Sequence, residues 1–301
     1  MEAREELPSF LIVGAAKCGT TSLHHYLMHS GMVEMPRMKE THFFADEVLN
    51  CNASIKSGPY GSHKIVDIEK YKSLFSSSKG VIRGETCVSY LYFFKQSVKK
   101  IKQILGDPKI IILLRNPLER SFSNYMHHVR DGFEKLSYDQ ALAQIDNRKE
   151  DKWWWGYDYV GGSLYFNTVK YYLENFSHVK ILFFEDFKEC PLNTLEEIHR
   201  FLDIPYQDII YKNLNLSEHN KSYVPKFPFI MRLLKRYRAM RLSMHYAKKV
   251  LYFLPIESCL ISNHKISDTH PSIDLHKIFY EDAQKLGDLI NVNLMEKWFK
   301  R

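Results

Sequence analysis

The sequence is poor in cysteine and in long apolar runs, and its first residues lack the pattern of a signal peptide. Its 301 residues include five cysteines and no C-x-x-C pair, which argues against a disulfide framework and against a zinc site. Apolar runs such as IIILL at 110–114 are far shorter than the roughly 20 residues of a membrane-spanning helix. The N-terminal residues MEAREELPS lack the basic start and apolar stretch of a signal peptide. We therefore expect a soluble, cytoplasmic protein.

Positive charge is concentrated in one part of the chain. The net charge is +7, and the segment 226–249 holds eight Lys and Arg residues with no Asp or Glu. Apolar residues at helical spacing in this segment favour an amphipathic helix with a solvated basic face. The alternative is a surface for an anionic substrate or peripheral contact with a membrane. No nucleic-acid-binding signature accompanies the charge, so nucleic acid is not an expected partner.

Short apolar runs alternate with helical patterns along the chain. The expected strands are 10–13, 81–84, 109–114 and 179–184, and the expected helices are 21–29, 95–105, 117–130, 162–175 and 191–202. This alternation predicts an α/β fold with a central parallel sheet between two helical layers. We expect one domain over residues 1–301, with a core at about 8–205 and a helical, basic region at about 226–301 packed on it. In such sheets ligands bind beyond the carboxyl ends of the strands.

The first expected strand ends in a loop suited to phosphate. This phosphate loop, Gly14–Ser22, has small residues that let N–H groups close around an anion at a helix N-terminus. Its glycines have the spacing of a nucleoside-triphosphatase loop, but Thr20 replaces the usual lysine, and Lys17 lies inside the loop. The strand at 109–114 is followed by Arg115 instead of a magnesium-binding aspartate. The pattern is P-loop-like and predicts phosphates held by protein cations without a metal.

These residues resemble the sulfotransferases that use 3′-phosphoadenosine-5′-phosphosulfate (PAPS), in particular the heparan sulfate sulfotransferases and their soluble bacterial relatives. The resemblance is clear over residues 10–130 and looser beyond them. It implies that the phosphate loop wraps the 5′-phosphosulfate and that Arg115 and Ser123 bind the 3′-phosphate. Lys221 and Ser222 resemble part of a loop that closes over the nucleotide. The implied loop ligands are Lys17, Cys18, Gly19, Thr20, Thr21 and Ser22.

A third element, KETHFF at Lys39–Phe44, resembles the K-E-x-H-F-F segment of the same family. Sulfuryl transfer to an alcohol needs a base for the acceptor proton and a cation for the charge on the departing oxygen. The resemblance implies Glu40 as the base and Lys17 as the cation and proton donor. His42 would orient the acceptor or share the role of base. The expected donor is PAPS, the expected product is its desulfo form PAP, and no metal is expected.

One segment departs from the family pattern. GETCVSYL at 84–91 aligns with E-K-T-P-A-Y, so that a second active-site lysine would fall on Thr86. Its loss argues against a highly sulfated polysaccharide and favours a hydroxyl, or an amine, of a carbohydrate or small metabolite. The alternative is a magnesium-dependent, kinase-like enzyme, for which Glu85 and Glu185 are the candidate carboxylates.

Two further patterns allow more than one interpretation. Three consecutive tryptophans, Trp153–Trp155, would line a pocket or lid, or fill a gap between core and C-terminal helices. The histidine pairs at 24–25 and 127–128 lie on expected helices, where adjacent residues do not share a face. We expect structural roles for them, with His127 or His128 as a further candidate base.

Overall fold

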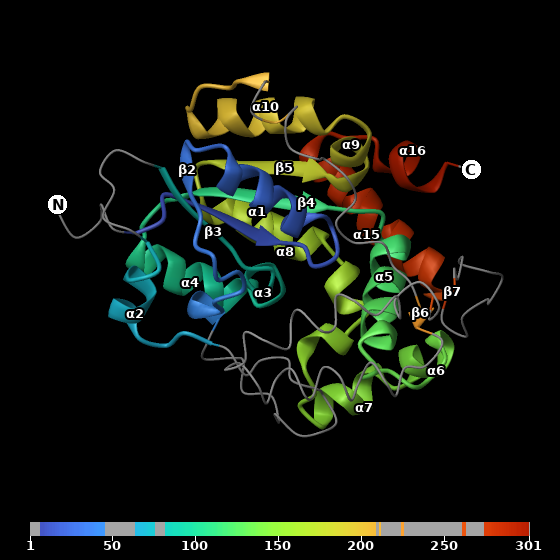
Figure 1. The fold of residues 1–301 in the computed structure, drawn as a ribbon. Coiled ribbons are helices and arrows are strands. Elements are labelled where there is room, and N and C mark those ends of the chain that lie inside the picture. Colours follow the sequence, from blue (N-terminus) through green and yellow to red (C-terminus); the bar gives the residue numbers. More distant parts are fainter. Residues whose placement is uncertain are drawn as a thin grey trace.

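The computed structural model, drawn in Figure 1, describes the greater part of the chain. The described residues are 7–45, 64–75, 82–208, 211, 224–225, 261–262 and 274–300. Lys221, Ser222 and the basic segment 226–249 lie outside the described residues. The predictions for them stay predictions.

A parallel five-stranded sheet forms the centre of the fold, with the strand order β2-β3-β1-β4-β5. The strands are β1 (Phe10–Gly14), β2 (Val33–Glu34), β3 (Ile82–Thr86), β4 (Lys109–Leu114) and β5 (Val179–Phe183). The four strands expected from apolar runs are confirmed, and the α/β class with them. β2 was missed because two residues are too few to form a pattern. A separate antiparallel pair joins β6 (Val224–Pro225) to β7 (Ile261–Ser262).

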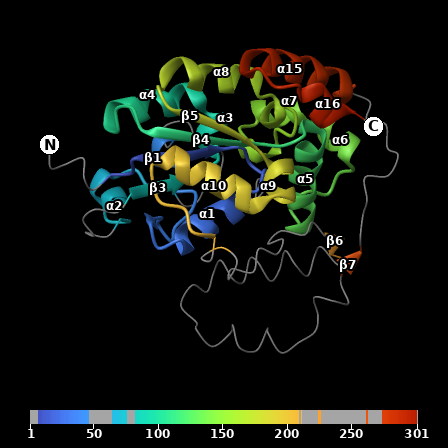
Figure 2. The same cartoon turned by 90° about the horizontal axis from the view of Figure 1, so that it is seen from above.

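Helices cover both faces of the sheet, as Figure 2 shows: α4, α8 and α15 lie on one side, and α1, α9 and α10 on the other. The helices around the sheet are α1 (Thr20–His29), α4 (Phe94–Ile104), α8 (Phe166–Asn175), α9 (Phe184–Glu189), α10 (Pro191–Leu202), α15 (Leu275–Ile290) and α16 (Leu294–Phe299). The remaining ones are α2 (Ile68–Lys72), α3 (Ser89–Tyr92), α5 (Pro117–Arg130), α6 (Tyr138–Ala143) and α7 (Ile145–Glu150). The expected three-layer arrangement is confirmed.

The expected helices agree with the structure to within a residue or so, with one exception. The pattern at 162–175 begins as a short 3₁₀ turn, Gly161–Ser163, before α8 starts at Phe166. Short 3₁₀ turns also occur at Phe43–Ala45 and Trp155–Tyr157. Such turns are too short to give a 3.6-residue period, which is why the sequence did not separate them.

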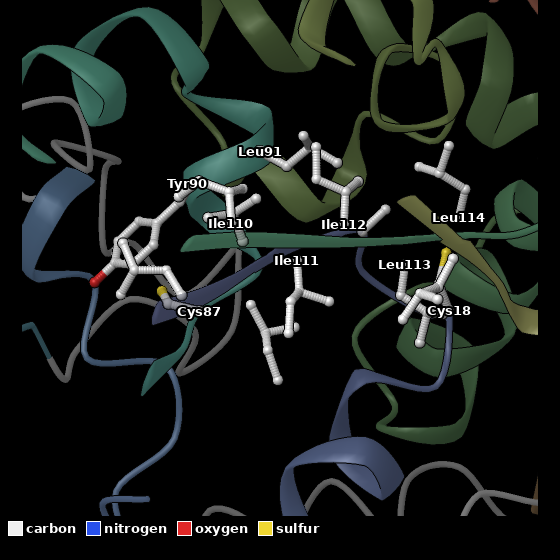
Figure 3. Packing of buried hydrophobic residues seen from close by; sticks show 14 of the residues in the cluster. Cys18, Cys87, Tyr90, Leu91, Ile110, Ile111, Ile112, Leu113 and Leu114 are labelled. Carbon is white, nitrogen blue, oxygen red and sulfur yellow. The ribbon is translucent and has the colours of Figure 1, made fainter. Parts of the chain in front are cut away.

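The apolar runs of β1 and β4 become central strands that are buried on both faces. Figure 3 shows Ile110, Ile112 and Leu114 pointing to one side of β4, and Ile111 and Leu113 to the other. All five side chains are fully buried. Burying a side chain of this size contributes about 1.5–3 kcal/mol, so the central strands hold the carboxyl edge of the sheet in a fixed position. The candidate site lies at that edge.

Candidate functional site at the carboxyl edge of the sheet

The strand register brings three predicted elements to one edge of the sheet. Ile12 of β1 lies opposite Thr86 at the end of β3, and Gly14 lies opposite Ile112 of β4. Beyond these pairs, Ala15 N–H donates to Leu113 O at 2.7 Å. The phosphate loop therefore emerges between the ends of β3 and β4, where ligands of parallel sheets bind.

The N-terminus of α1 is open at the end of the phosphate loop. Gly19 precedes α1 with φ +88°, and no side chain in the described part of the chain caps this helix. A Cβ at this position would lie 3.0 Å from the Phe184 ring, so both conformation and space favour glycine. By contrast, the Asn116 side chain caps α5 by accepting hydrogen bonds from Leu118 and Glu119 N–H. The first N–H groups of α1 are thus suited to an anionic ligand.

Lys17 lies among several cations. Burial, together with the positive charges of Arg130, Arg115 and Arg120, lowers the pKa of its amine to about 8, although Asp131 opposes them. The sequence had singled out Arg115 but not Arg130 or Arg120. Both stand on α5, and their nearness to Lys17 depends on how α5 packs rather than on a motif. The cluster gives this end of the sheet the charge that a phosphate requires.

Arg115 links the end of β4 to the phosphate loop. Its Nη1 donates to the Lys17 carbonyl oxygen at 3.4 Å, and its Nη2 and Nε donate to Glu119 at 2.7 and 3.2 Å. The guanidinium lies 4.5 Å from the Phe184 ring centroid. Ser123 is half-buried on α5. The two residues predicted for the 3′-phosphate thus stand at the end of β4 and on the helix that follows it.

The loop residues differ in what they can offer. Cys18 and Thr20 have buried side chains, and Figure 3 shows the Cys18 sulfur beside Leu113 in the core. Burial raises the pKa of the Cys18 thiol to about 12, so the residue can present only its main chain to a ligand. Thr21 and Ser22 are half-buried at the start of α1, where hydroxyl groups remain partly accessible.

Glu40 is fixed beside the end of β3. Its N–H donates to Thr86 O at 3.1 Å, and its Oε2 accepts a hydrogen bond from Val88 N–H at 2.8 Å. Its Oε1 is paired with Lys39. Burial favours a raised pKa for this carboxyl, but Lys39, His42 and the Val88 N–H together lower it. Glu40 is therefore ionised at neutral pH, as a general base must be.

His42 points back toward the segment after β3. Its Nδ1 is hydrogen-bonded with Ser89 Oγ at 2.8 Å, and its ring meets Trp154 edge-on at 5.6 Å. Burial lowers the pKa of the imidazole and the charge of Lys39 lowers it too, although Glu40 opposes them. His42 is neutral at pH 7, so it can accept or donate a hydrogen bond without carrying charge.

The three residues predicted to be catalytic share an unusual backbone conformation. Lys17, Glu40 and His42 have φ values of 69°, 62° and 57°. Among the described residues, six other than glycine have positive φ, and half of them are these three. A left-handed conformation costs of order 1 kcal/mol or more for such residues, and it persists where the surroundings impose it, often at functional sites.

The buried side chain of Glu85 anchors the KETHFF segment through Thr41, a role that the sequence did not reveal. Its buried carboxylate accepts hydrogen bonds from Thr41 Oγ1, from Tyr90 OH at 2.9 Å and from Tyr71 OH at 2.5 Å. Burial raises the pKa of Glu85 to about 7, although the hydroxyl donors oppose the rise. Thr41 stands between Glu40 and His42, so the carboxylate holds the stretch that carries both. In the sequence, the only sign of this role was that GETCVSYL contains a glutamate and a tyrosine, Glu85 and Tyr90.

The carboxylates that a magnesium-dependent mechanism would need are engaged elsewhere. Glu85 accepts three hydroxyl donors. Glu185 accepts a hydrogen bond from Asn116 N–H at 2.8 Å and one from Trp298 Nε1 at 3.2 Å. Glu185 thereby joins the start of α5 to α16, which is a structural role.

The tryptophan stretch forms packed structure beside the site. Trp154 is buried against His42, and Asn124 of α5 donates to Gly156 O at 2.6 Å. The buried Arg120 donates to Gly162 O at 2.7 Å and to Tyr159 O at 3.2 Å. These bonds favour the interpretation as a packing segment over that of a lid.

The histidine pairs have partners that fit structural roles. His24 Nδ1 is hydrogen-bonded with Thr86 Oγ1 at 3.1 Å, at the position aligned with the family's second lysine. His128 is buried, stacks on Tyr157 at 4.2 Å between ring centroids and contacts Tyr159 OH at 3.2 Å. His127 Nδ1 lies 2.6 Å from Arg130 Nη2.

No helix in the part of the chain that the structure describes is long and apolar enough to cross a membrane. The cytoplasmic location stays a prediction.

Comparisons with known proteins identify relatives for most of this region. The sequence model of the sulfotransferase family matches residues 8–208. A bifunctional heparan sulfate N-deacetylase/N-sulfotransferase 1 of Caenorhabditis elegans is 24% identical over 211 residues, which are 67% of this chain and 23% of that protein. A membrane-associated sulfotransferase, kil1, of Dictyostelium discoideum is 31% identical over 119 residues, or 40% of this chain and 22% of that protein. The chain thus spans about a quarter of the length of these curated relatives.

One solved structure matches nearly the whole chain. A sulfotransferase from Alicyclobacillus acidocaldarius has a TM-score of 0.70 and 28% sequence identity, with 98% of this chain and 99% of that chain covered.

Proposed function

The chain belongs to the sulfotransferase family, and on this premise we propose that it transfers the sulfuryl group of PAPS to a hydroxyl or amine of a carbohydrate or small-metabolite acceptor. One observation carries the proposal. The phosphate loop, Arg115 and the KETHFF segment, which are far apart in sequence, lie at the same edge of the sheet. This edge offers an anion site and a carboxylate base side by side.

The chain's own groups fit the two phosphates of this donor. The uncapped N-terminus of α1 and Lys17 suit the 5′-phosphosulfate. Arg115, with its forked donors and with Ser123 on the next helix, suits the 3′-phosphate. We assign Lys221 and Ser222 to the same phosphate on the resemblance alone.

In the proposed reaction the donor supplies an activated sulfuryl group. Side chains of the protein transfer protons and stabilise the negative charge that develops on the departing oxygen. Glu40 accepts the proton of the acceptor hydroxyl while that oxygen bonds to sulfur. Lys17 faces the bridging oxygen whose bond to sulfur breaks, and it donates a proton there because its pKa is about 8. Neutral His42 orients the acceptor through a hydrogen bond. The products are the sulfated acceptor and PAP, and no step uses a metal.

The charge of the site supports the proposed acceptor class. Thr86, bonded with His24, stands where the resemblance predicts a second lysine, so that position offers no cation to a polyanionic chain. A weakly charged carbohydrate or small metabolite suits this site better than a highly sulfated polymer. The N-sulfation and deacetylation named for the nematode relative belong to a protein of which this chain spans 23%.

A thermal-shift titration tests the donor. PAP at about 100 times its Kd stabilises the native state by roughly 2.7 kcal/mol, and we expect this shift to survive EDTA and to shrink greatly with ADP, which lacks the 3′-phosphate. Arg115→Ala removes most of the PAP shift, whereas Arg115→Lys retains part of it. Stabilisation by ATP with magnesium alone would instead indicate phosphoryl transfer.

A second experiment tests the base. Glu40→Gln keeps the shape of the side chain but cannot accept the acceptor proton, so the sulfuryl-transfer rate falls by ~10²–10⁴-fold while the Kd for PAP stays within about twofold. Glu196→Gln, an exposed change on α10, serves as the matched control. Full activity in Glu40→Gln would exclude Glu40 as the base.

A further inference from the structure

Three potential metal ligands meet at the base side of the site. Glu40, His42 and Cys87 each offer one ligand atom, and these atoms lie within 4.8 Å of one another. The Cys87 sulfur is 3.5 Å from His42 Nδ1. Cys87 directly follows β3 and donates its N–H to Ile12 O at 3.0 Å, so the sheet fixes the main chain on which the thiol stands.

The spacing of sulfur and nitrogen fits a tetrahedral ion. With Zn–S about 2.3 Å and Zn–N about 2.05 Å, a tetrahedral angle sets the sulfur and nitrogen about 3.6 Å apart. The observed separation of Cys87 Sγ and His42 Nδ1 is 3.5 Å. The Glu40 carboxylate completes three ligands after a side-chain movement on the order of 1 Å, which leaves a fourth position for water.

The chemistry of the set selects the ion. A thiolate and an imidazole favour zinc or cobalt over magnesium or calcium, which prefer oxygen ligands. Cys87 is fully buried and His42 nearly so, whereas the Glu40 side chain is 28% exposed. An ion would therefore enter past Glu40 and be held from below by Cys87 and His42. A coordinating thiol is deprotonated by the metal itself.

Binding also has costs within this cluster. Ser89 Oγ lies 2.8 Å from His42 Nδ1 and 3.2 Å from the Cys87 sulfur, and it must release the imidazole before the ion binds. Lys39, paired with Glu40, must turn away from the incoming charge. The Val88 N–H bond to Glu40 Oε2 can remain, because a carboxylate has several lone pairs.

We propose that Glu40, His42 and Cys87 form a binding site for a zinc-type divalent ion. Occupation of this site takes the Glu40 carboxylate, so the ion acts as an inhibitor of sulfuryl transfer; this consequence rests on the proposed function, but the binding does not.

Cobalt(II) titration of the full chain without nucleotide tests the site directly. We expect a thiolate-to-cobalt charge-transfer band that saturates at one ion per chain and disappears when zinc is added in competition. Cys87→Ser should weaken zinc binding by at least ~100-fold, beyond the ~10–100-fold typical for loss of an outer-shell partner. Cys190→Ser, which changes an exposed cysteine, should leave both band and affinity unchanged.

The proposal is overturned if wild type gives no charge-transfer band, if the band persists in Cys87→Ser, or if it is lost in Cys190→Ser. The circular dichroism spectrum and the PAP thermal shift of Cys87→Ser verify that this variant is folded. Zinc inhibition of turnover is then measured with and without EDTA. If zinc binds at Cys87 without inhibiting turnover, the metal site is supported and the role of Glu40 as base is contradicted. A failure of the metal site can thus be told apart from a failure of the proposed function.

Discussion

The two halves of the candidate site are held in different ways. In the phosphate loop, α1 starts without a side-chain cap, and Arg115 is paired with Glu119, whose side chain is 49% exposed. In the KETHFF segment, Glu40 accepts an N–H, Thr41 donates to buried Glu85, and His42 is bonded with Ser89. One half presents positive groups to a ligand, and the other is braced by the protein itself.

This difference predicts different responses to change. Lys17 of the phosphate loop lies among cations whose mutual repulsion a bound anion would reduce further, so mutants here should alter nucleotide affinity and its dependence on pH. The KETHFF segment depends on a buried hydrogen-bond network, so its mutants should alter stability and positioning with little effect on nucleotide affinity. The following measurements test the contrast, from the largest expected effect to the smallest.

Loss of the loop cation should have the largest effect. Lys17→Ala removes the charge that we propose to face the departing oxygen, and kcat/KM for sulfuryl transfer should fall by at least ~10³-fold, comparable with loss of an oxyanion donor. Lys17→Arg keeps the positive charge and is also not glycine, so the strained backbone conformation at φ 69° is unchanged. This variant should retain much of the PAP affinity. A Lys17→Ala rate within tenfold of wild type would remove this residue from the reaction.

Glu85→Gln tests the braced half through pH. The pKa of Glu85 is about 7 in the folded protein against a usual 4.5, so the native state binds its proton more tightly than the unfolded state does. Its stabilising contribution is full below pH 4.5 and is lost as pH rises to about 7. The glutamine variant does not titrate, so its stability relative to wild type should rise by up to about 3 kcal/mol across that window.

Urea unfolding at pH 4.5 and pH 7.5 measures this difference. Glu69→Gln on α2, where the glutamate is exposed, is the control and should show a flat difference between the two pH values. Glu85→Gln should also lower the transfer rate while the PAP shift is retained, because it disturbs Thr41 between the two catalytic candidates. A pH-independent difference would mean that Glu85 is not protonated in the native state.

The loss of the Lys17 charge should appear as a change of slope when the Kd for PAP is plotted against pH. With a pKa of about 8, Lys17 is charged below that pH and loses its proton above it. The Kd for PAP, measured by calorimetry from pH 7 to 9.5, should be flat at first and then rise by up to tenfold per pH unit. In Lys17→Arg the rise should vanish, since arginine stays charged; the same rise in that variant would assign the change of slope to another group.

The smallest expected effect concerns Glu119, the partner of Arg115. Glu119→Gln removes the carboxylate paired with Arg115, which would compete with the proposed 3′-phosphate, and PAP should bind about two- to fivefold more tightly, in keeping with the ~0.2–1 kcal/mol of an exposed ion pair. The gain should shrink in high salt. Weaker binding of PAP would show that Glu119 positions Arg115 instead of competing for it.

Much of the fold followed from local patterns. The buried runs of β1, β4 and β5 and the periodic α5 and α10 agree with the expected ranges to within about a residue. Each of these elements is long enough to show its period. The short elements β2, α2 and α3 give no such signal, because their positions depend on contacts with other parts of the chain.

The residues of the candidate site were named from motifs, and their roles stay predictions; their surroundings could not be predicted from the sequence. Lys17, Arg115, Glu40 and His42 were named from motifs, and the structure brings their segments to one edge of the sheet. The tryptophan stretch was ambiguous, because aromatic residues at 153–155 suit a pocket wall and a packed segment equally. Its hydrogen bonds to α5 favour the packed segment.

By itself, the sequence determined the order of four of the five strands in the central sheet and of helices α1, α4, α5, α8 and α10, the loop at the end of β1 and the types of residues available for sulfuryl transfer. Only the tertiary structure brought Glu85 under Thr41, Arg130 near Lys17, and the Cys87 sulfur to 3.5 Å from His42. Secondary structure is encoded by periods of a few residues along the chain. Ionisation and metal coordination depend instead on burial and on distances through space, which are fixed when distant segments pack together.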